Sequence, residues 1–549
     1  MLRQEGGQVT VFLALTFFIL LGAALCVLEG MYSYMESSLA EDAVKGAGNY
    51  VLANYDRNLF ERYHLFFLDP RERERMETDG KEYLAKYLDK KSFFRFSCRR
   101  LDITDEKTAV DEDGLYLKHQ IREWMKYREV AKAGESLKEL LESARDARTA
   151  NSLAKSDMGE AESAIRESEN DNGQSGQNGG EPDAGGQSGS AADGAGGQND
   201  GTAAGQSGNE NNGSASDHDK EQTGGKTGIQ WKDLKELLTN ITRSGILVYV
   251  TDDVGEVSTL SVDTENLPSG QRVSEKEAAD FFSGALSFLK VDEWKKLLGE
   301  IRTEEGGSRV LADEVYLLEY IEDNFASYVD ENDKVERALK YETEYLIAGK
   351  ASDMDNLKAV ADRILCLRFL SNYMYLSQNS QWKAASGSAA AALTGILGFP
   401  QKAKKAVQVL LTAAVSFGES MLDVHALFTG EEVPVMKDAS TWNLTLENAV
   451  SLLKNRGPVK KGNVNADYED YLKLFLLSRM ERSAALFRMM DIMQLNVALE
   501  KPGFLMEKAL FAFRWEAEFS CGGWFTVFPG TGQSGTGGFT VELDRMNSY

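Results

Sequence analysis

Residues 9–28 read VTVFLALTFFILLGAALCVL and contain no charged side chain. At about 1.5 Å of rise per residue, this stretch makes a helix of about 30 Å, the thickness of the hydrocarbon core of a bilayer. A cleaved secretory signal has a shorter apolar region of about 7–15 residues that ends in small residues. A cut after Ala24 would leave the apolar residues 25–28 behind. The stretch therefore predicts a retained transmembrane helix over residues 9–28, preceded by a cytoplasmic leader stub over residues 1–8.

The charges on either side of this stretch predict its orientation. Arg3 and the α-amino group precede it, whereas four acidic residues follow it before the first lysine: Glu29, Glu36, Glu41 and Asp42. Positively charged flanks stay in the cytoplasm. We therefore expect a single-pass protein of the cell membrane with a cytoplasmic N-terminus and most of the chain outside the cell.

An apolar stripe continues beyond the predicted membrane segment. Met31, Met35, Leu39 and Ala43 recur every four residues, and Ala47 and Val51 continue the series past Gly46 and Gly48. The pattern predicts a stalk helix over residues 29–70, which Asp69-Pro70 would end because proline lacks a backbone donor. An ordinary amphipathic helix lying on a core fits the same pattern.

The remaining sequence predicts an α+β fold with a large extracytoplasmic helical bundle and a small antiparallel sheet. Residues 71–167 combine a strand, SFFRFSCRRLDIT over 92–104, with a long helix. A second α+β segment is expected over 229–309, the bundle over 310–500 and a β-hairpin over 501–549. In the hairpin, Phe511, Phe513, Trp515, Ala517 and Phe519 alternate with polar or small residues, as do Phe539, Val541 and Leu543. The apolar runs 384–399 and 406–417 are shorter than a membrane span, so we interpret them as buried bundle helices, with a membrane hairpin as the alternative.

Residues 168–228 consist mainly of Gly, Ser, Gln, Asn, Asp and Ala. So few large apolar side chains cannot offset the conformational entropy lost on folding. We expect this segment to be a disordered linker.

Charge and cysteine content exclude several classes of function. The net charge of −25 at pH 7 disfavours binding to nucleic acid, whose phosphates need a basic surface. The four cysteines form no CxxC pair, which indicates neither a zinc site nor a disulfide framework, although a single Cys98–Cys521 bridge stays open.

Each candidate motif for catalysis or cofactor binding lacks a feature that the chemistry requires. The four histidines lack metal-ligand spacing. A formal GxGxxG at Gly530, Gly532 and Gly535 is followed by a strand pattern instead of the helix that a dinucleotide fingerprint needs. The acidic stretches YVDENDK and VDEDGLY miss the EF-hand pattern. We therefore expect no catalytic residue, no cofactor, no metal ligand and no small-molecule substrate.

Several blocks resemble one uncharacterised family. The start GGQVTVFLAL with the acidic end LEG, then YDRNLFERYHLFFLD, YETEYLIAGKASDMDNLKAV, LFTGEEVPVMKDASTWNLTLENA and YEDYLKLFLLSRMERSAALFRMMDIMQ, are similar to membrane-anchored Gram-positive proteins known as domain of unknown function 5702. The N-terminus of that family is similar to the TadE and TadG pseudopilins, and its genes tend to accompany tight-adherence pilus or secretion clusters. The resemblance implies an accessory subunit of such an assembly, with no catalytic residues to transfer.

The resemblance also implies which N-terminal residues have a role. A pilin-type leader would be cut between Gly7 and Gln8, although Phe12 stands where the assembly glutamate of a pilin would be. Apart from the resemblance, the small side chains at Gly22, Ala23 and Ala24 would let other membrane helices approach closely, and Glu29 would lie at the outer interface.

The leading hypothesis is thus a pseudopilin-like structural component that acts through protein–protein association. Its expected partners are the bilayer and other pilus or secretion subunits, which it would contact through its transmembrane and stalk helix. A surface-anchored hydrolase with carboxylate acid and base, or a cell-surface binding or adhesion protein, are the alternatives.

Overall fold

The structure is a computed structural model, and it describes residues 5–69, 73–89, 96–128, 135–174, 245–251, 254–272, 308–330, 335–397, 403–478, 482–522 and 538–549. Most of the described residues are helical, with small antiparallel sheets, as the sequence predicts. The part of the predicted linker from residue 175 onward lies outside the described residues. The first seven residues of the predicted linker, 168–174, belong to helix α5 (Glu135–Gln174), so this helix extends farther than the composition suggested.

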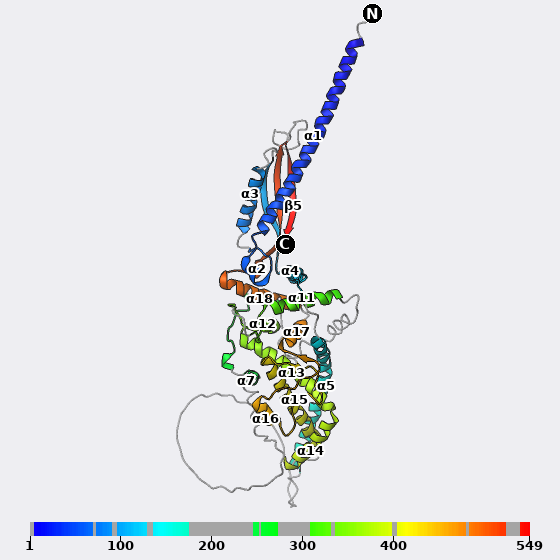
Figure 1. Ribbon diagram of the computed structural model, residues 1–549, viewed down its shortest axis with the longest axis vertical. Coiled ribbons are helices and arrows are strands. Elements are labelled where there is room, and N and C mark those ends of the chain that lie inside the picture. Colours follow the sequence, from blue (N-terminus) through cyan, green and yellow to red (C-terminus); the bar gives the residue numbers. More distant parts are fainter. Residues whose placement is uncertain are drawn as a thin grey trace, which may run out of the picture.

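The molecule is elongated (Figure 1), with the N-terminal helix α1 (Glu5–Leu52) projecting from one end. A three-stranded sheet lies beside the second half of α1, and the helical bundle lies beyond the sheet at the far end. Two described helices are long and apolar enough to cross a membrane, α1 over Val9–Leu52 and α15 (Lys404–Phe428). By length and composition, α1 is a signal anchor or a signal sequence, whereas most of the apolar window in α15 is buried in the protein.

The three-stranded sheet has the antiparallel order β1-β4-β5, with β1 at Phe96–Thr108, β4 at Leu510–Gly522 and β5 at Gly538–Ser548. Its register aligns Leu101 with Ala517 in one pair of strands and Phe519 with Val541 in the other. The alternation along β4 is the predicted one, because its five apolar residues from Phe511 to Phe519 are all buried. The predicted C-terminal strand pair is therefore confirmed, and β1 completes the sheet.

Helices α1 and α3 (Arg73–Asp89) cover one face of this sheet and enclose a core with it. Six apolar residues of α1 belong to this core: Ala40, Ala43, Val44, Ala47, Val51 and Leu52. Tyr32 and Glu36, nearer the N-terminus, are also buried. Within the predicted stripe, the residues from Ala43 onward pack on this core, whereas Met31 and Met35 are at least half exposed. The opposite face of the sheet is charged, with ion pairs such as Arg100–Glu516 at 2.8 Å and Arg514–Asp544 at 3.0 Å.

The stalk helix is shorter than expected, because α1 ends at Leu52 and not at residue 70. The chain turns, and the Asp56 carboxylate accepts a 3.0 Å hydrogen bond from the backbone N–H of Leu59 to start helix α2 (Arg57–Tyr63). Leu68 then exchanges two backbone hydrogen bonds of 2.9 Å with Leu510 at the start of β4. A local cap therefore competes successfully with continuation of the long helix.

Two side chains fasten this junction. Lys501 forms ion pairs with Asp56 at 2.8 Å and with Asp69 at 2.6 Å. The hydroxyl of Tyr549 donates a 2.6 Å hydrogen bond to the carbonyl oxygen of Leu52, where α1 ends. Residues from both ends of the described chain thus meet between the sheet and the bundle.

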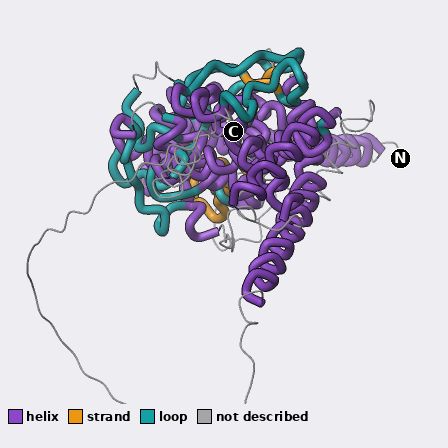
Figure 2. The backbone as a smooth tube through the Cα atoms, turned by 90° about the horizontal axis from the view of Figure 1, so that it is seen from below, coloured by secondary structure: helices purple, strands orange, loops and turns teal. Residues whose placement is uncertain are grey.

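The bundle encloses the larger core, and Figure 2 shows how far helices dominate this end of the molecule. Besides α5 and α15, its longer helices are α4 (Leu115–Met125), α11 (Ser308–Asn324), α12 (Glu342–Ala348), α13 (Asp353–Gln378), α14 (Ser380–Leu397), α16 (Ala449–Asn455), α17 (Tyr468–Ser478) and α18 (Arg482–Glu500). The short elements are η2 (Asp111–Gly114), α7 (Leu247–Val250), η3 (Val254–Glu256), α8 (Pro268–Arg272), η5 (Met506–Lys508) and the strand pair β2 (Val433–Pro434) and β3 (Asn465–Ala466). Within residues 245–251 and 254–272, the structure has short helices and one isolated bridge, Ser261–Ser352, where a second α+β segment was expected.

Two sequence signals inside the bundle are confirmed. Gly349 follows α12 in the left-handed conformation, with φ of 64°. Ser352 then caps α13, because its hydroxyl oxygen accepts a hydrogen bond of 3.2 Å from the backbone N–H of Asp355. The apolar runs in α14 and α15 pack on each other, and α15 also packs on α13, as expected of bundle helices.

The two cysteines considered for a bridge lie on neighbouring strands of the sheet. Cys98 pairs with Phe519 and Cys521 pairs with Phe96, so the cysteines are two residues out of register. Both side chains belong to the same core, and both thiols are free. The sequence therefore suggested the right neighbourhood, but the register leaves the two cysteines diagonal to one another.

Candidate functional site

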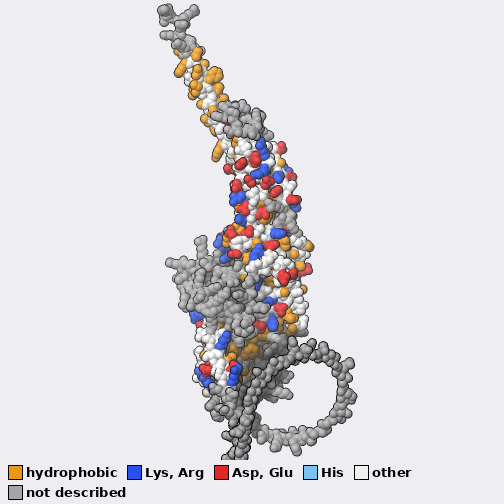
Figure 3. Space-filling view, turned by 180° about the vertical axis from the view of Figure 1, so that it is seen from behind, with side chains coloured by type: hydrophobic (Ala, Val, Ile, Leu, Met, Phe, Trp, Pro, Cys, Tyr) orange, Lys and Arg blue, Asp and Glu red, His pale blue; other side chains and the backbone are white. Residues whose placement is uncertain are grey.

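The candidate functional site is the apolar surface of α1 that projects from the molecule. Twelve bulky side chains between residues 9 and 28 are 42–72 % exposed, with Phe12 the most exposed. They are Val9, Val11, Phe12, Leu13, Leu15, Phe17, Phe18, Ile19, Leu20, Leu21, Val27 and Leu28. Figure 3 shows them as a nearly uncharged rod, in contrast to the mixed charges over the sheet. We call residues 9–28 the apolar rod.

The apolar rod and the packed half of α1 form one continuous helix, with every residue from Glu5 to Leu52 helical. A surface of this kind is far larger than the few hundred Å² of contiguous apolar patch that a soluble monomer exposes. Each exposed CH₂ group that finds an apolar partner contributes about 0.8 kcal/mol. The arrangement therefore favours burial of the rod in lipid or against other apolar helices, with the sheet held at its base.

The predicted packing residues lie together on the rod. An added Cβ at Gly22 would meet no atom within 4 Å, and Ala23 and Ala24 are exposed. Glu29 is half-buried and lies one residue past the end of the rod. Gly7 and Gln8, the predicted leader junction, lie near the start of α1. The described part of the chain brings no other element to these small residues, which leaves that turn of the helix available to a partner.

Three apolar side chains extend the exposed surface past Leu28. Met31, Tyr34 and Met35 are 59 %, 77 % and 50 % exposed. The buried residues of this part of the helix are Tyr32 and Glu36, and the apolar pattern missed that face because Glu36 is charged. A search for apolar residues at helical spacing skips the position of Glu36, so it cannot identify this buried face.

Glu36 itself lies in the core between α1 and the sheet, and its side chain is fully buried. Burial, and then the negative charge of Glu36, raise the pKa of the Cys521 thiol to about 12. This thiol stays protonated and unreactive at neutral pH, since the thiolate is the nucleophile. The pair Glu36 and Cys521 thus belongs to the structure of the core and not to a reactive centre.

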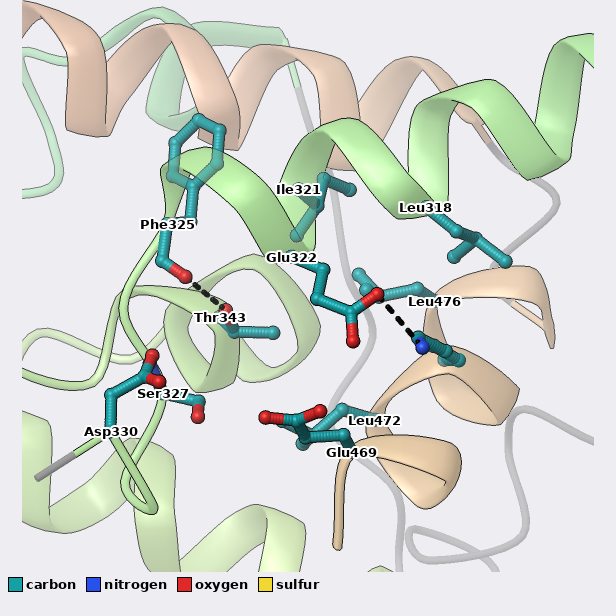
Figure 4. Close-up of a pocket in the computed structure, with 11 residues that line it drawn as sticks. Leu318, Ile321, Glu322, Phe325, Ser327, Asp330, Thr343, Glu469, Leu472 and Leu476 are labelled. Atoms are coloured by element: carbon teal, nitrogen blue, oxygen red, sulfur yellow. Dashed lines mark hydrogen bonds and ion pairs between the residues drawn. The ribbon is translucent and has the colours of Figure 1, made fainter. Parts of the chain in front are cut away.

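A second candidate is a pocket between α11 and α17 (Figure 4), which is lined by the three carboxylates Glu322, Asp330 and Glu469. Glu322 forms an ion pair of 2.8 Å with Lys473, and burial and then Glu322 raise the pKa of Glu469 to about 7. An acid with a raised pKa beside an ionised one is the arrangement that glycoside hydrolysis uses. The cavity, however, measures about 30 Å³, enough for one or two water molecules and far below the roughly 300 Å³ of a ligand pocket. This pocket therefore gives no support to the hydrolase alternative.

Two larger hollows are open to solvent. One of about 500 Å³ lies between α5 and α15, and there Lys405 binds Glu160 at 2.8 Å and lowers the pKa of Glu160. The other, of about 520 Å³, lies between α3 and β1 and includes Cys98, whose pKa is raised by burial. Neither lining brings together an acid and a base with matched pKa values, and in the described part of the chain no three Asp, Glu, His or Cys side chains form a metal-binding group.

The most densely charged cluster lies inside the bundle. Arg368 donates hydrogen bonds to Asp423 at 2.8 and 3.0 Å, and Lys437 pairs with Asp423 at 2.8 Å and with Glu419 at 2.7 Å. All four side chains are at most 2 % exposed. Two cations and two anions compensate one another, so this buried cluster fixes the loop around Lys437 onto α13 and α15.

Comparison with known proteins gives one match. The model of a protein family matches residues 226–521, more than half of the chain, and this family is described as a family of unknown function, DUF5702. The matched range includes most of the bundle and nearly all of β4, and it begins after α1 and β1. No curated protein and no solved structure matches the chain.

Proposed function

The chain belongs to DUF5702, a family of unknown function, and from this premise we propose that it is a membrane-anchored, pseudopilin-like accessory subunit of a tight-adherence pilus or secretion assembly. It acts by protein–protein association and not by catalysis. Its apolar rod spans the cell membrane, its N-terminus is cytoplasmic, and the sheet and bundle are outside the cell.

One observation carries this proposal: the apolar rod continues without a break into the half of α1 that packs on an antiparallel sheet. A signal sequence that is removed after translocation has no need of a rigid connection to the folded part. Here the core that α1 shares with the sheet includes six apolar residues of the helix, from Ala40 to Leu52. Removing α1 would expose the apolar face of the sheet, which supports retention of the helix in the working protein.

The chemistry of the rod suits a helix that has both lipid and protein neighbours. Leucine, isoleucine and phenylalanine side chains suit the hydrocarbon region, and the turn at Gly22, Ala23 and Ala24 permits close approach of a second helix. In lipid, association depends on this close packing because there is no hydrophobic drive between helices. The small-residue turn is therefore the part of the rod on which the proposed association depends most.

The first test replaces Gly22 by leucine in the full-length protein in cells. We expect the Gly22→Leu variant to insert into the membrane normally and to co-purify at least several-fold less with partner subunits. Val27→Leu is the matched control, since it adds bulk on a different side of the rod, and it should leave co-purification unchanged. Equal co-purification of Gly22→Leu and wild type would contradict the proposal.

The second test asks where the protein is located and whether it is processed. Cells are sheared, and the protein and its N-terminal residue are determined in the filament and membrane fractions. A species that begins at Gln8 in the filament fraction identifies a processed pseudopilin, whereas an intact N-terminus confined to membranes identifies an unprocessed accessory anchor. A chain that is released and begins after residue 28 would refute the anchor.

A further inference from the structure

The pocket between α11 and α17 is lined by more acidic than basic side chains. Four charged side chains line it, and three of them are carboxylates: Glu322, Asp330 and Glu469. The cation Lys473 pairs with Glu322 at 2.8 Å (Figure 4). Glu469 comes from α17 and Glu322 from α11, so ionisation of both would place two like charges across the contact between these helices.

A buried hydroxyl faces the same pocket. The Ser327 side chain is within a residue that is 8 % exposed, and its Oγ has no hydrogen-bond partner among the described residues. In Figure 4 the Ser327 hydroxyl and the Glu469 carboxylate lie on facing sides of the pocket. The cavity of about 30 Å³ has room for a water molecule that could bridge them. The pocket therefore contains a polar group opposite the Glu469 carboxyl in addition to its acids.

We propose that Glu322 and Glu469 share one proton and together form a proton-dependent clasp, which holds α11 against α17 while the proton is bound and loosens when both carboxyls are ionised. The proton forms the hydrogen bond between the two carboxyl groups, and Lys473 neutralises the one negative charge that remains. This inference is independent of the proposed function, because it concerns the bundle and not the apolar rod.

The surroundings set the pH at which the clasp opens. Charged groups face it from both helices and from the turn after α11: Glu319, Glu322, Asp323, Asp330, Asp467, Asp470 and Lys473. Burial and then Glu322 raise the pKa of Glu469 to about 7, and burial followed by the same Glu322 charge raises the pKa of Glu319. The acids outnumber the cations, so the clasp responds near neutral pH.

The clasp is placed where it affects more than one helix. On its other side, α11 is tied to the elements near the sheet, since the Tyr320 hydroxyl donates a 2.6 Å hydrogen bond to the carbonyl oxygen of Tyr63. Arg128, just after α4, pairs with Asp323 at 2.6 Å. Opening of the clasp would therefore separate α11 from the bundle while α11 remains attached at the sheet side.

The test is native-state hydrogen exchange of the full-length protein in detergent micelles or nanodiscs at pH 6 and pH 8, corrected for the intrinsic pH dependence of exchange. A single linked proton with a pKa near 7 increases the local opening equilibrium up to about tenfold between these pH values. We expect this increase in the amides of α11 and α17. Glu469→Gln, which mimics the protonated carboxyl, should abolish it and keep both helices protected at pH 8.

Glu431→Gln is the control, because Glu431 is exposed in a loop and does not line the pocket. It should leave the tenfold response of α11 and α17 in place. Glu322→Gln should also abolish the response, since it removes the second charge by a different change. The clasp is overturned if wild-type protection in α11 and α17 has the same corrected value at both pH values, or if the response persists in Glu469→Gln.

Discussion

The ring of Tyr83 in α3 lies so close to Gly46 in α1 that a Cβ atom at position 46 would overlap the tyrosine hydroxyl. Tyr83 also stacks on Tyr50, one turn farther along α1, with ring centroids 5.5 Å apart. Glycine therefore sets the distance between the two helices that cover the sheet. A residue that looks like a flaw in the helical stripe is in fact a point of contact.

Replacing Gly46 by leucine should lower the free energy of unfolding by about 1–3 kcal/mol, because the added side chain forces α3 away from α1. Chemical denaturation of the full-length protein in detergent measures this change. Gly30→Leu is the matched control in the same helix, since an added Cβ there meets no atom within 4 Å. Gly30→Leu should change the free energy of unfolding by no more than about 0.5 kcal/mol. Equal changes in the free energy of unfolding at the two positions would show that helix propensity, and not the contact with Tyr83, causes the loss of stability.

Breaking the buried charge cluster around Asp423 should destabilise the protein more than the change at Gly46. Burial opposes ionisation of Asp423, but the charges of Arg368 and Lys437 outweigh it and hold the pKa of this carboxyl below its ordinary value. Asp423→Asn removes the negative charge that both cations share and should destabilise the protein by about 3–5 kcal/mol. The comparison is Glu432→Gln, which breaks the exposed Lys461–Glu432 pair and should cost less than about 1 kcal/mol. A small effect of Asp423→Asn would mean that the cluster is not structural.

Glu344 predicts the pH dependence of stability. Its Oε1 accepts hydrogen bonds from the backbone N–H of Tyr328 at 2.9 Å and from the Tyr468 hydroxyl at 2.8 Å, and burial raises its pKa from 4.5 to about 7. The folded state therefore holds this proton more tightly than the unfolded chain, and the free energy of unfolding falls as pH rises from about 4.5 to about 7.

Glu344→Gln keeps the accepting oxygen and removes the titration. Between pH 5 and pH 8 the wild type should lose about 2–3 kcal/mol more stability than this variant, so that the variant is the more stable protein at pH 8. Denaturant titrations at both pH values measure the difference, with the exposed Glu431→Gln as control. Parallel pH profiles of wild type and Glu344→Gln would refute the assignment.

The sequence predicted those parts of the fold that local pattern controls. The apolar rod, the alternation along β4 and the cap at Ser352 all depend on neighbours within a few residues. The pairing of β1 with β4 depends on residues more than 400 positions apart, such as Leu101 and Ala517, and no periodicity can reveal it. Likewise, the backbone pairing of Leu68 with Leu510, which follows the turn after α1, joins residues that only the folded chain brings together.

The sequence predicted the apolar rod itself, but it did not predict the exposed side chains that extend the apolar surface beyond residue 28. Gly22, Ala23 and Ala24 lie on the exposed rod where the composition placed them. Met31 and Met35 belong to the predicted apolar stripe, but they are exposed, and the buried positions beside them are Tyr32 and Glu36. A buried acid does not register in an apolar pattern. The pocket acids Glu322 and Glu469 were missed for a different reason, since they belong to helices far apart in the sequence.

The single strand β4 contributes Phe511 to the core of the bundle and Phe519 to the core beneath α1. The strands run roughly along α1 and the long axis of the molecule (Figure 1), and the hydrogen bonds of an antiparallel sheet are perpendicular to its strands. A tensile force along the strands would therefore shear the whole ladder of hydrogen bonds at once, and would not open them one after another. In mechanical terms, the sheet lies beside the packed half of α1 in the orientation that resists pulling along the molecule most strongly.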